Sequence, residues 1–258
     1  MKTMILLACL CCTLFSCENV EKKAGEKLQT AREAFERGDF SEAKMQIDSI
    51  KILYPKAFET RREGISLMQQ VELKEQEKTL VYLDSLLQKK QSELDAIKGK
   101  FTLEKDAEYL RFQVNETGQM SMTSIYCGPS NIHHISVKVI APDGSFAETP
   151  ASKDSYETTD LGEKIEKADY KIGEDGNVIG FLYLNKDKNI KVNYQGERPY
   201  STTMTPADRQ AVASVYELAQ LLSSITEIKK EMEEANLKIE FVKRKMQERE
   251  EKETEQGK

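Results

Sequence analysis

The longest regular pattern in the chain lies at residues 215–246, VYELAQLLSSITEIKKEMEEANLKIEFVKRKM. Apolar residues recur in this stretch at steps of three and four, which is the spacing of a heptad seam along one long helix. The charged residues between the seam positions predict a solvated outer face. One consecutive pair of three-residue steps, around Ile225, indicates a local stammer. The ten seam positions are Val215, Leu218, Leu222, Ile225, Ile228, Met232, Ala235, Ile239, Val242 and Met246.

The ends of this helix have their own signals. Thr205 is suited to an N-cap, Pro206 to the first helical position and Asp208 to the first turn, where a carboxylate is favourable. The sequence therefore predicts a helix over residues 205–248. Residues 249–258 lack the apolar positions and are predicted to fray.

A second seam lies upstream, with two polar interruptions. It consists of Leu73, Gln76, Leu80, Leu83, Leu87, Lys90, Leu94, Ile97 and Phe101. Because the two seams bracket a different kind of sequence, the simplest arrangement is an antiparallel coiled-coil stalk with a domain inserted between its helices. The competing arrangement is a homo-oligomer, a parallel dimer through the C-terminal seam.

Residues 107–204 are β-rich. Strand-like runs at 109–114, 119–127, 132–140, 177–184 and 189–194 alternate with Gly, Pro, Asn and Asp turn signals. This pattern predicts an antiparallel head, either a sandwich or an open barrel. Residues 145–170 are compatible with a further strand, a long loop or a short helix at 160–168. The predicted fold class is α+β.

Residues 24–106 are predicted to hold a helical hairpin and the first stalk helix. Gly38-Asp39 interrupts a helical apolar pattern over residues 24–57, and Asp39 with Glu42 has the spacing of a capping box. Pro55 is expected to end the second helix and to open the next.

The hairpin resembles a single tetratricopeptide (TPR) repeat. Ala31, Gly38, Phe40, Ala43 and Pro55 carry the likeness, and the Gly-Asp-Phe turn is similar to that of TPR lipoproteins of outer-membrane protein assembly. The sequence departs from the repeat at Ile50, where a small residue is usual, and residues 58–91 hold no second such turn. Because about three repeats are normally needed for a solenoid, we expect a TPR-like hairpin that packs on its neighbours rather than a peptide-binding groove.

Residues 1–17, MKTMILLACLCCTLFSC, have the order of a signal peptide. Lys2 precedes an apolar run from Met4 to Phe15, which is shorter than the roughly 20 residues that cross a bilayer. The stretch resembles a bacterial lipoprotein signal through Leu14, Ser16 and Cys17, although Phe15 departs from the usual small residue.

The resemblance implies cleavage between Ser16 and Cys17 and acylation of Cys17. It makes residues 1–16 the signal peptide and 17–23 a lipidated linker. The expected location is the envelope of a Gram-negative bacterium, at the outer membrane on its periplasmic or surface side. The alternative is an ordinary secretory signal with an incidental cysteine.

The amino-acid composition excludes some classes of protein. The chain has 258 residues, of which 32% are charged, with a net charge of −6 and no Trp. This balance excludes a multi-span membrane protein and argues against nucleic-acid binding, which needs a basic face. Cys127 alone remains after the signal and Cys17, so an intramolecular disulfide is excluded, and we expect Cys127 to be a buried strand residue.

Few residues in the head suggest chemistry. Tyr126, Tyr183 and Tyr194 are candidates for a binding surface, because tyrosine offers both a ring and a hydroxyl group. His133 and His134 would face opposite sides of a strand and could not jointly bind one metal ion. No catalytic motif is present, so no catalytic residue, metal or cofactor is predicted.

The sequence therefore predicts a non-catalytic, lipid-anchored envelope protein that acts as a scaffold, spacer or binding module. Its expected partners are the membrane and another envelope protein or a polysaccharide. The alternatives are a TPR-type assembly or peptide-binding factor for outer-membrane proteins, an efflux-adaptor-like component, and an enzyme in the β head.

Overall fold

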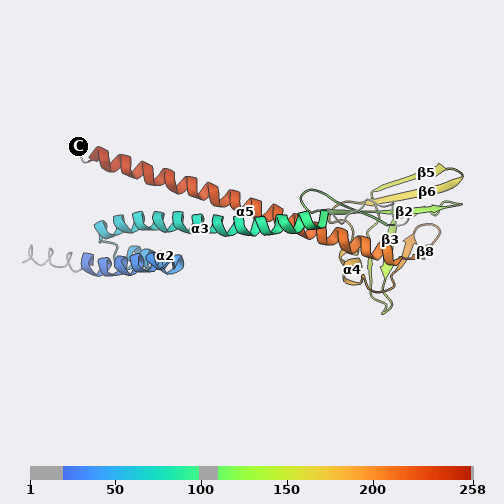
Figure 1. Cartoon of the computed structure of the whole chain (residues 1–258), viewed down its shortest axis with the longest axis horizontal. Coiled ribbons are helices and arrows are strands. Elements are labelled where there is room, and N and C mark those ends of the chain that lie inside the picture. The colour runs from blue at the N-terminus through green and yellow to red at the C-terminus, as the bar shows by residue number, and fades with distance from the viewer. Residues whose placement is uncertain (1–19, 99–109, 257–258) are drawn as a thin grey trace, which may run out of the picture. The chain divides into compact units, whose positions relative to one another are not determined.

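The computed structural model describes residues 20–98 and 110–256, and its fold is α+β, as predicted (Figure 1). Along the chain, long helices precede two antiparallel sheets, and one long helix follows them. The chain divides into two compact units. The helical unit comprises residues 1–85 and 230–258, and the sheet unit comprises residues 86–229.

The helical unit begins with a helical hairpin. Residues 20–36 are helical, and α2 (Phe40–Leu53) follows after a turn at Gly38, whose φ of +76° suits glycine. The Oδ1 atom of Asp39 accepts a hydrogen bond from the Glu42 backbone N–H at 3.1 Å, which confirms the Asp39 half of the predicted capping box. The Asp39 N–H donates to the Ala34 carbonyl oxygen at 2.9 Å and not to Glu42, so the reciprocal half does not form. Residues 20–23, predicted to belong to a linker over residues 17–23, are already helical, and residues 17–19 lie outside the described residues.

The core of the helical unit joins this hairpin to α3 (Phe58–Lys98). Small residues of the hairpin let the helix backbones approach closely, and Leu67 and Val71 of α3 pack against them. The buried members are Ala24, Leu28, Ala31, Ala34, Ala43, Ile47, Ile50, Ala57, Leu67 and Val71. Pro55 lies in the turn after α2 and does not open α3, which begins three residues later at Phe58.

Both long helices bury their seams. On α3, Leu83 and Leu94 are buried and the other described seam positions are half-buried, while Phe101 lies outside the described residues. On α5 (Pro206–Gln256) all ten seam positions are buried or half-buried. This helix continues eight residues beyond the predicted end at 248, because its Glu, Lys, Gln and Arg residues are good helix formers. None of the helices in the described ranges is long and apolar enough to cross a bilayer.

The sheet unit contains two four-stranded antiparallel sheets. The first has the order β1 (Leu110–Val114), β2 (Met120–Gly128), β6 (Glu163–Tyr170) and β5 (Asp154–Asp160). The second has the order β4 (Phe146–Glu148), β3 (Ser136–Ile140), β7 (Lys191–Gln195) and β8 (Tyr200–Thr203). Side chains from both sheets, from α4 (Val178–Leu184) and from the start of α5 form one apolar core.

The strand predicted at 177–184 is wrong, because these residues form α4. A short apolar run fits either a buried strand or one buried side of a helix. Here Val178, Ile179 and Leu182 face the core at helical spacing, and the Oδ2 atom of Asp175 accepts from the Ile179 backbone N–H at 2.9 Å.

Two further boundaries differ from the prediction. Residues 132–135 do not extend β3, since His133 has a φ of 55° that a strand cannot contain. Residues 145–170 form β4, β5 and β6 rather than a helix at 160–168. Leu161 and Gly162, with φ values of 49° and 91°, make the two-residue hairpin between β5 and β6.

Beside the sheets, the sheet unit also contains the ends of the two long helices. Leu87, Leu94 and Ile97 of α3 form one apolar cluster with four residues of α5. Those four are Leu218, Leu221, Leu222 and Ile225. The two seams therefore meet in this unit.

Candidate functional site

A buried polar network occupies the interior of the sheet unit. Ser124 on β2 and Glu166 on β6 belong to neighbouring strands of the first sheet, and His134 lies in the segment that leads into β3 of the second sheet. All three residues are buried: the exposed fraction is 0% for Ser124, 2% for Glu166 and 3% for His134. Buried groups of this kind need partners, because unpaired burial costs free energy.

The Glu166 carboxylate is held by three consecutive backbone N–H groups. Its Oε1 atom accepts from the N–H of Ile132 at 2.6 Å and of His133 at 3.0 Å. Its Oε2 atom accepts from the N–H of His134 at 2.9 Å and lies 3.0 Å from Nδ1 of the same ring. The positive φ of His133 turns successive N–H groups toward one point, which forms an anion-binding concavity.

The charge states follow from these contacts. Burial raises the pKa of Glu166, but the hydrogen bonds from His134, His133 and Ile132 outweigh it and hold the pKa below its ordinary value. Burial lowers the pKa of His134 below its ordinary value, against the opposing effect of Glu166. An ionised Glu166 therefore accepts from a neutral His134 through Nδ1–H. The Nε2 atom of that ring, 2.9 Å from Ser124 Oγ, is then the acceptor for the serine hydroxyl.

The hydrogen-bonded chain from Ser124 through His134 to Glu166 has the arrangement of a nucleophile, a base and a carboxylate that orients the base. Attack on a substrate requires access to the serine Oγ atom, and Ser124 is fully buried in the middle of β2. The geometry thus supports a structural role, in which the network ties the first sheet to the segment entering the second. The His134 ring also meets Tyr194 of β7 edge to face, with centroids 5.1 Å apart.

An exposed rim continues this network to the surface. Nδ1 of His133 lies 2.7 Å from Oε1 of Glu157 on β5, and Asn131 donates to the other oxygen of Glu157 at 2.6 Å. Atoms of His133, Glu157 and Glu166 lie within 4.8 Å of one another, the spacing of a metal site. Glu166 already accepts four hydrogen bonds, which leaves two ligands and falls short of a zinc site.

We expect the stability of the protein to fall in acid because of this network. His134 has a lowered pKa, so its contribution begins to be lost as pH falls below the ordinary value of 6.5. Glu166 also has a lowered pKa, so its contribution is lost as pH falls from 4.5 through the folded value. His134→Asn keeps a donor toward Glu166 and cannot titrate. Its unfolding free energy, measured with urea, should change less between pH 7.5 and pH 5 than that of the wild type.

His133→Asn is the control with the opposite sign. The hydrogen bond to Glu157 raises the pKa of His133, so this residue contributes stability below pH 6.5 that is lost as pH rises through the folded value. Removing His133 should therefore steepen the loss in acid. An unchanged slope for His134→Asn would contradict the assignment of the neutral buried ring.

The three tyrosines predicted to form a binding surface lie in packed contacts instead. Tyr126 and Tyr194 are buried in the core, where each packs against Tyr200. Tyr183 is half-buried on α4, and its ring stacks on Tyr216 of α5 at 4.1 Å. The three rings therefore do not form one surface.

Of the two cysteines with a predicted role or location, the structure describes only Cys127. Cys127 lies on β2, but the prediction that it is buried is wrong, because the alternation of β2 turns Ser124 and Tyr126 inward and Cys127 outward. Its Sγ atom donates to Oε2 of Glu163 at 2.8 Å. Ser16 and Cys17, the predicted cleavage and lipidation residues, lie outside the described residues.

Sequence reasoning missed Glu166. The signal was present in β6, EKIEKADY, where Ala168 and Tyr170 alternate with charged residues and Glu166 shares their parity. That pattern places Glu166 on the core face. Its partners were not readable, because His134 is 32 residues away.

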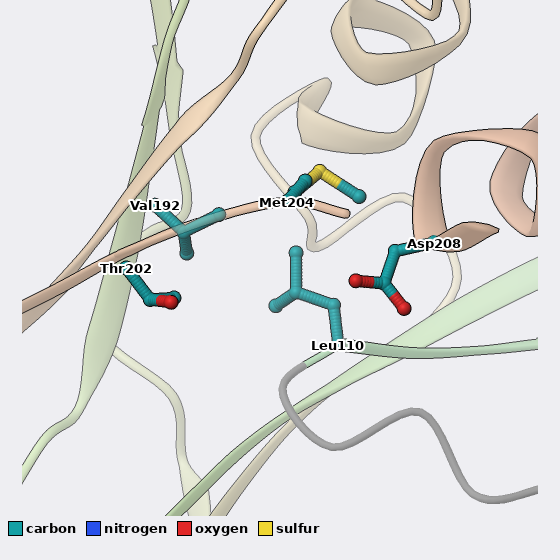
Figure 2. Close-up of a pocket in the computed structure, with 5 residues that line it drawn as sticks. All are labelled: Leu110, Val192, Thr202, Met204 and Asp208. Atoms are coloured by element: carbon teal, nitrogen blue, oxygen red, sulfur yellow. The ribbon is translucent and has the colours of Figure 1, made fainter. Parts of the chain in front are cut away.

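A small pocket lies between the sheets and the start of α5. Figure 2 shows its lining by Leu110, Val192, Thr202, Met204 and Asp208. Its volume of about 10 Å³ holds one water molecule at most. The Asp208 carboxylate already accepts from the backbone N–H and hydroxyl of Thr205, at 3.0 and 2.7 Å, so this pocket is not a ligand site.

No protein-family model, curated protein or solved structure matches the chain.

Proposed function

We propose that the chain is a lipid-anchored protein of the bacterial envelope with a non-catalytic role as a scaffold, spacer or binding module. The observation that carries this proposal is the sequence Leu14-Phe15-Ser16-Cys17 at the end of a short apolar run. Acylation of Cys17 would hold the chain to the membrane. The described helix at residue 20 would then begin three residues from the anchor.

The long helices support a spacer role. At 1.5 Å per residue, the 41 residues of α3 extend about 60 Å and the 51 residues of α5 about 75 Å. Each buries one apolar seam, and the two seams meet in the sheet unit through Leu94 and Ile225. We propose that they pair as an antiparallel coiled coil that carries the β domain.

The N-terminal hairpin supports a packing role rather than a peptide groove. Its buried residues, such as Ala34 and Ile47, share a core with Leu67 and Val71 of α3. Side chains that already fill a core are not available to a peptide. We therefore propose a TPR-like hairpin that braces the start of α3.

The lipid anchor is tested by Cys17→Ala in cells fed a radiolabelled fatty acid. The wild type should incorporate label and fractionate with membranes, and Cys17→Ala should lose the label completely because Cys17 is the thiol that the lipoprotein-like signal presents for acylation. Cys127→Ala is the matched control: it removes an exposed cysteine and should keep full labelling. Equal labelling of wild type and Cys17→Ala would overturn the proposal.

A further inference from the structure

One end of the helical unit brings together the start of the described chain and the turn between α2 and α3. The Glu21 carboxylate accepts hydrogen bonds from the backbone N–H of Glu59 at 3.3 Å and of Thr60 at 3.4 Å, and from the Thr60 hydroxyl at 2.6 Å. These contacts cap the first turn of α3 with a residue from the first helix. Residues 20–24 and 51–62 therefore form one end of the unit, which we call the anchor-proximal face (Figure 1).

The turn itself is held rigidly at this face. The Arg61 guanidinium donates from Nη1 to the Pro55 carbonyl oxygen at 2.7 Å, and the Ala57 N–H donates to the Tyr54 carbonyl oxygen at 3.0 Å. Val20 and Tyr54 pack against the core of the same unit. These contacts hold the turn against the helix that starts at residue 20.

Three of these projecting side chains are large and apolar. Ile52, Leu53 and Phe58 are exposed by 75%, 58% and 69%. They lie within seven positions of one another, whereas hairpin residues such as Ile47 and Ile50 are buried. Ile52 and Leu53 end α2 and Phe58 begins α3, so all three lie at the turn between these helices. Exposed apolar residues at one such place indicate an interaction site.

Basic residues outnumber acidic ones on this face. The anchor-proximal face carries six Lys or Arg residues and two Glu residues in its sequence, although the whole chain has a net charge of −6. One of the two acids, Glu21, is engaged in the cap of α3. The basic residues are Lys22, Lys23, Lys51, Lys56, Arg61 and Arg62.

We propose that the anchor-proximal face rests on a phospholipid bilayer that contains anionic lipids. Apolar side chains flanked by Lys and Arg are the pattern of a surface that inserts shallowly at the headgroup level. Position and charge both favour this occupant: the described residues begin at this face, three residues after Cys17, and the face is basic. The inference deepens the proposed membrane anchoring, and the acyl group and this face would act as two membrane signals in one chain.

The test uses residues 18–258, which contain every described residue and no Cys17. This protein should co-sediment with vesicles of phosphatidylcholine and phosphatidylglycerol and bind far less to phosphatidylcholine alone, with binding that weakens as salt rises. Ile52→Ser, Leu53→Ser and Phe58→Ser together should lower the partition coefficient by roughly tenfold or more, since each loses apolar contact with the bilayer.

A matched control replaces three equally exposed apolar residues elsewhere in the helical unit. Val81→Ser, Tyr82→Ser and Leu237→Ser, at positions exposed by 73%, 65% and 58%, should leave the partition coefficient unchanged. Circular dichroism of both triple variants should match the wild type, because all six side chains are exposed.

Three outcomes would overturn the inference. The first is no binding to anionic vesicles, and the second is an equal loss in both triple variants. The third is a dimer in solution that only the Ile52, Leu53 and Phe58 variant disrupts, without vesicle binding by the wild type, which would assign the face to a second copy. Because this protein has no Cys17, failure here leaves the labelling test of the anchor standing, and failure of that test leaves this one standing.

Discussion

Glu166→Gln is expected to lower the free energy of unfolding by about 3–5 kcal/mol, the range for breaking a buried charged network. The carboxylate of Glu166 accepts from three backbone N–H groups and from His134. A glutamine keeps the shape but replaces one oxygen by an NH₂ group, which cannot accept. At least one backbone N–H would then face a donor and stay buried without a partner.

The measurement is urea unfolding of the full chain at pH 7.5, followed by circular dichroism. Glu163→Gln is the matched control, since it makes the same chemical change at an exposed position of the same strand. It should cost no more than about 0.5 kcal/mol. A loss below about 1 kcal/mol for Glu166→Gln would contradict the structural role of the network.

Gly118→Ala is expected to cost about 2–6 kcal/mol, from backbone strain and overpacking together. Gly118 lies in the turn between β1 and β2 with a φ of +80°. A Cβ atom there would lie 2.3 Å from the carbonyl oxygen of Ala219 and 2.3 Å from the backbone nitrogen of Ser223, both on α5. These contacts are with backbone, so the turn would have to separate from the helix.

Gly144→Ala is the control for strain alone. Gly144 has a similar φ of +85° in the turn between β3 and β4, but a Cβ atom would meet nothing within 4 Å. Its expected cost is about 1 kcal/mol. Urea unfolding gives the free-energy cost of each variant, and the difference between the two costs measures the close contact of the Gly118 turn with α5. Equal costs would contradict that close contact.

The helices were the most predictable part of the fold. The seam of α5 was readable because helical periodicity is local, and all ten of its positions are at least half-buried. The break at Gly38 was readable for the same reason, since a positive φ and an N-cap depend on adjacent residues. The run at 177–184 failed because a short apolar segment has no period that separates strand from helix.

The candidate site was much less predictable. The sequence predicted that His133 and His134 face opposite sides of a strand. The structure buries His134 and leaves His133 exposed, but residues 132–135 do not form a strand. The partners of His134 come from β2 and β6, at sequence separations of 10 and 32 residues. No local pattern pairs residues across such distances, because strand order depends on which faces pack together.

Local sequence was enough to predict the α+β class, the two helical seams and the resemblance of the first residues to a lipoprotein signal, since each depends on periodicity or composition over a short window. The two strand orders, the inward position of Glu166 beside His134, and the exposure of Ile52, Leu53 and Phe58 could be read only from the folded chain. Burial and hydrogen bonding depend on neighbours from distant parts of the chain, which no short window contains.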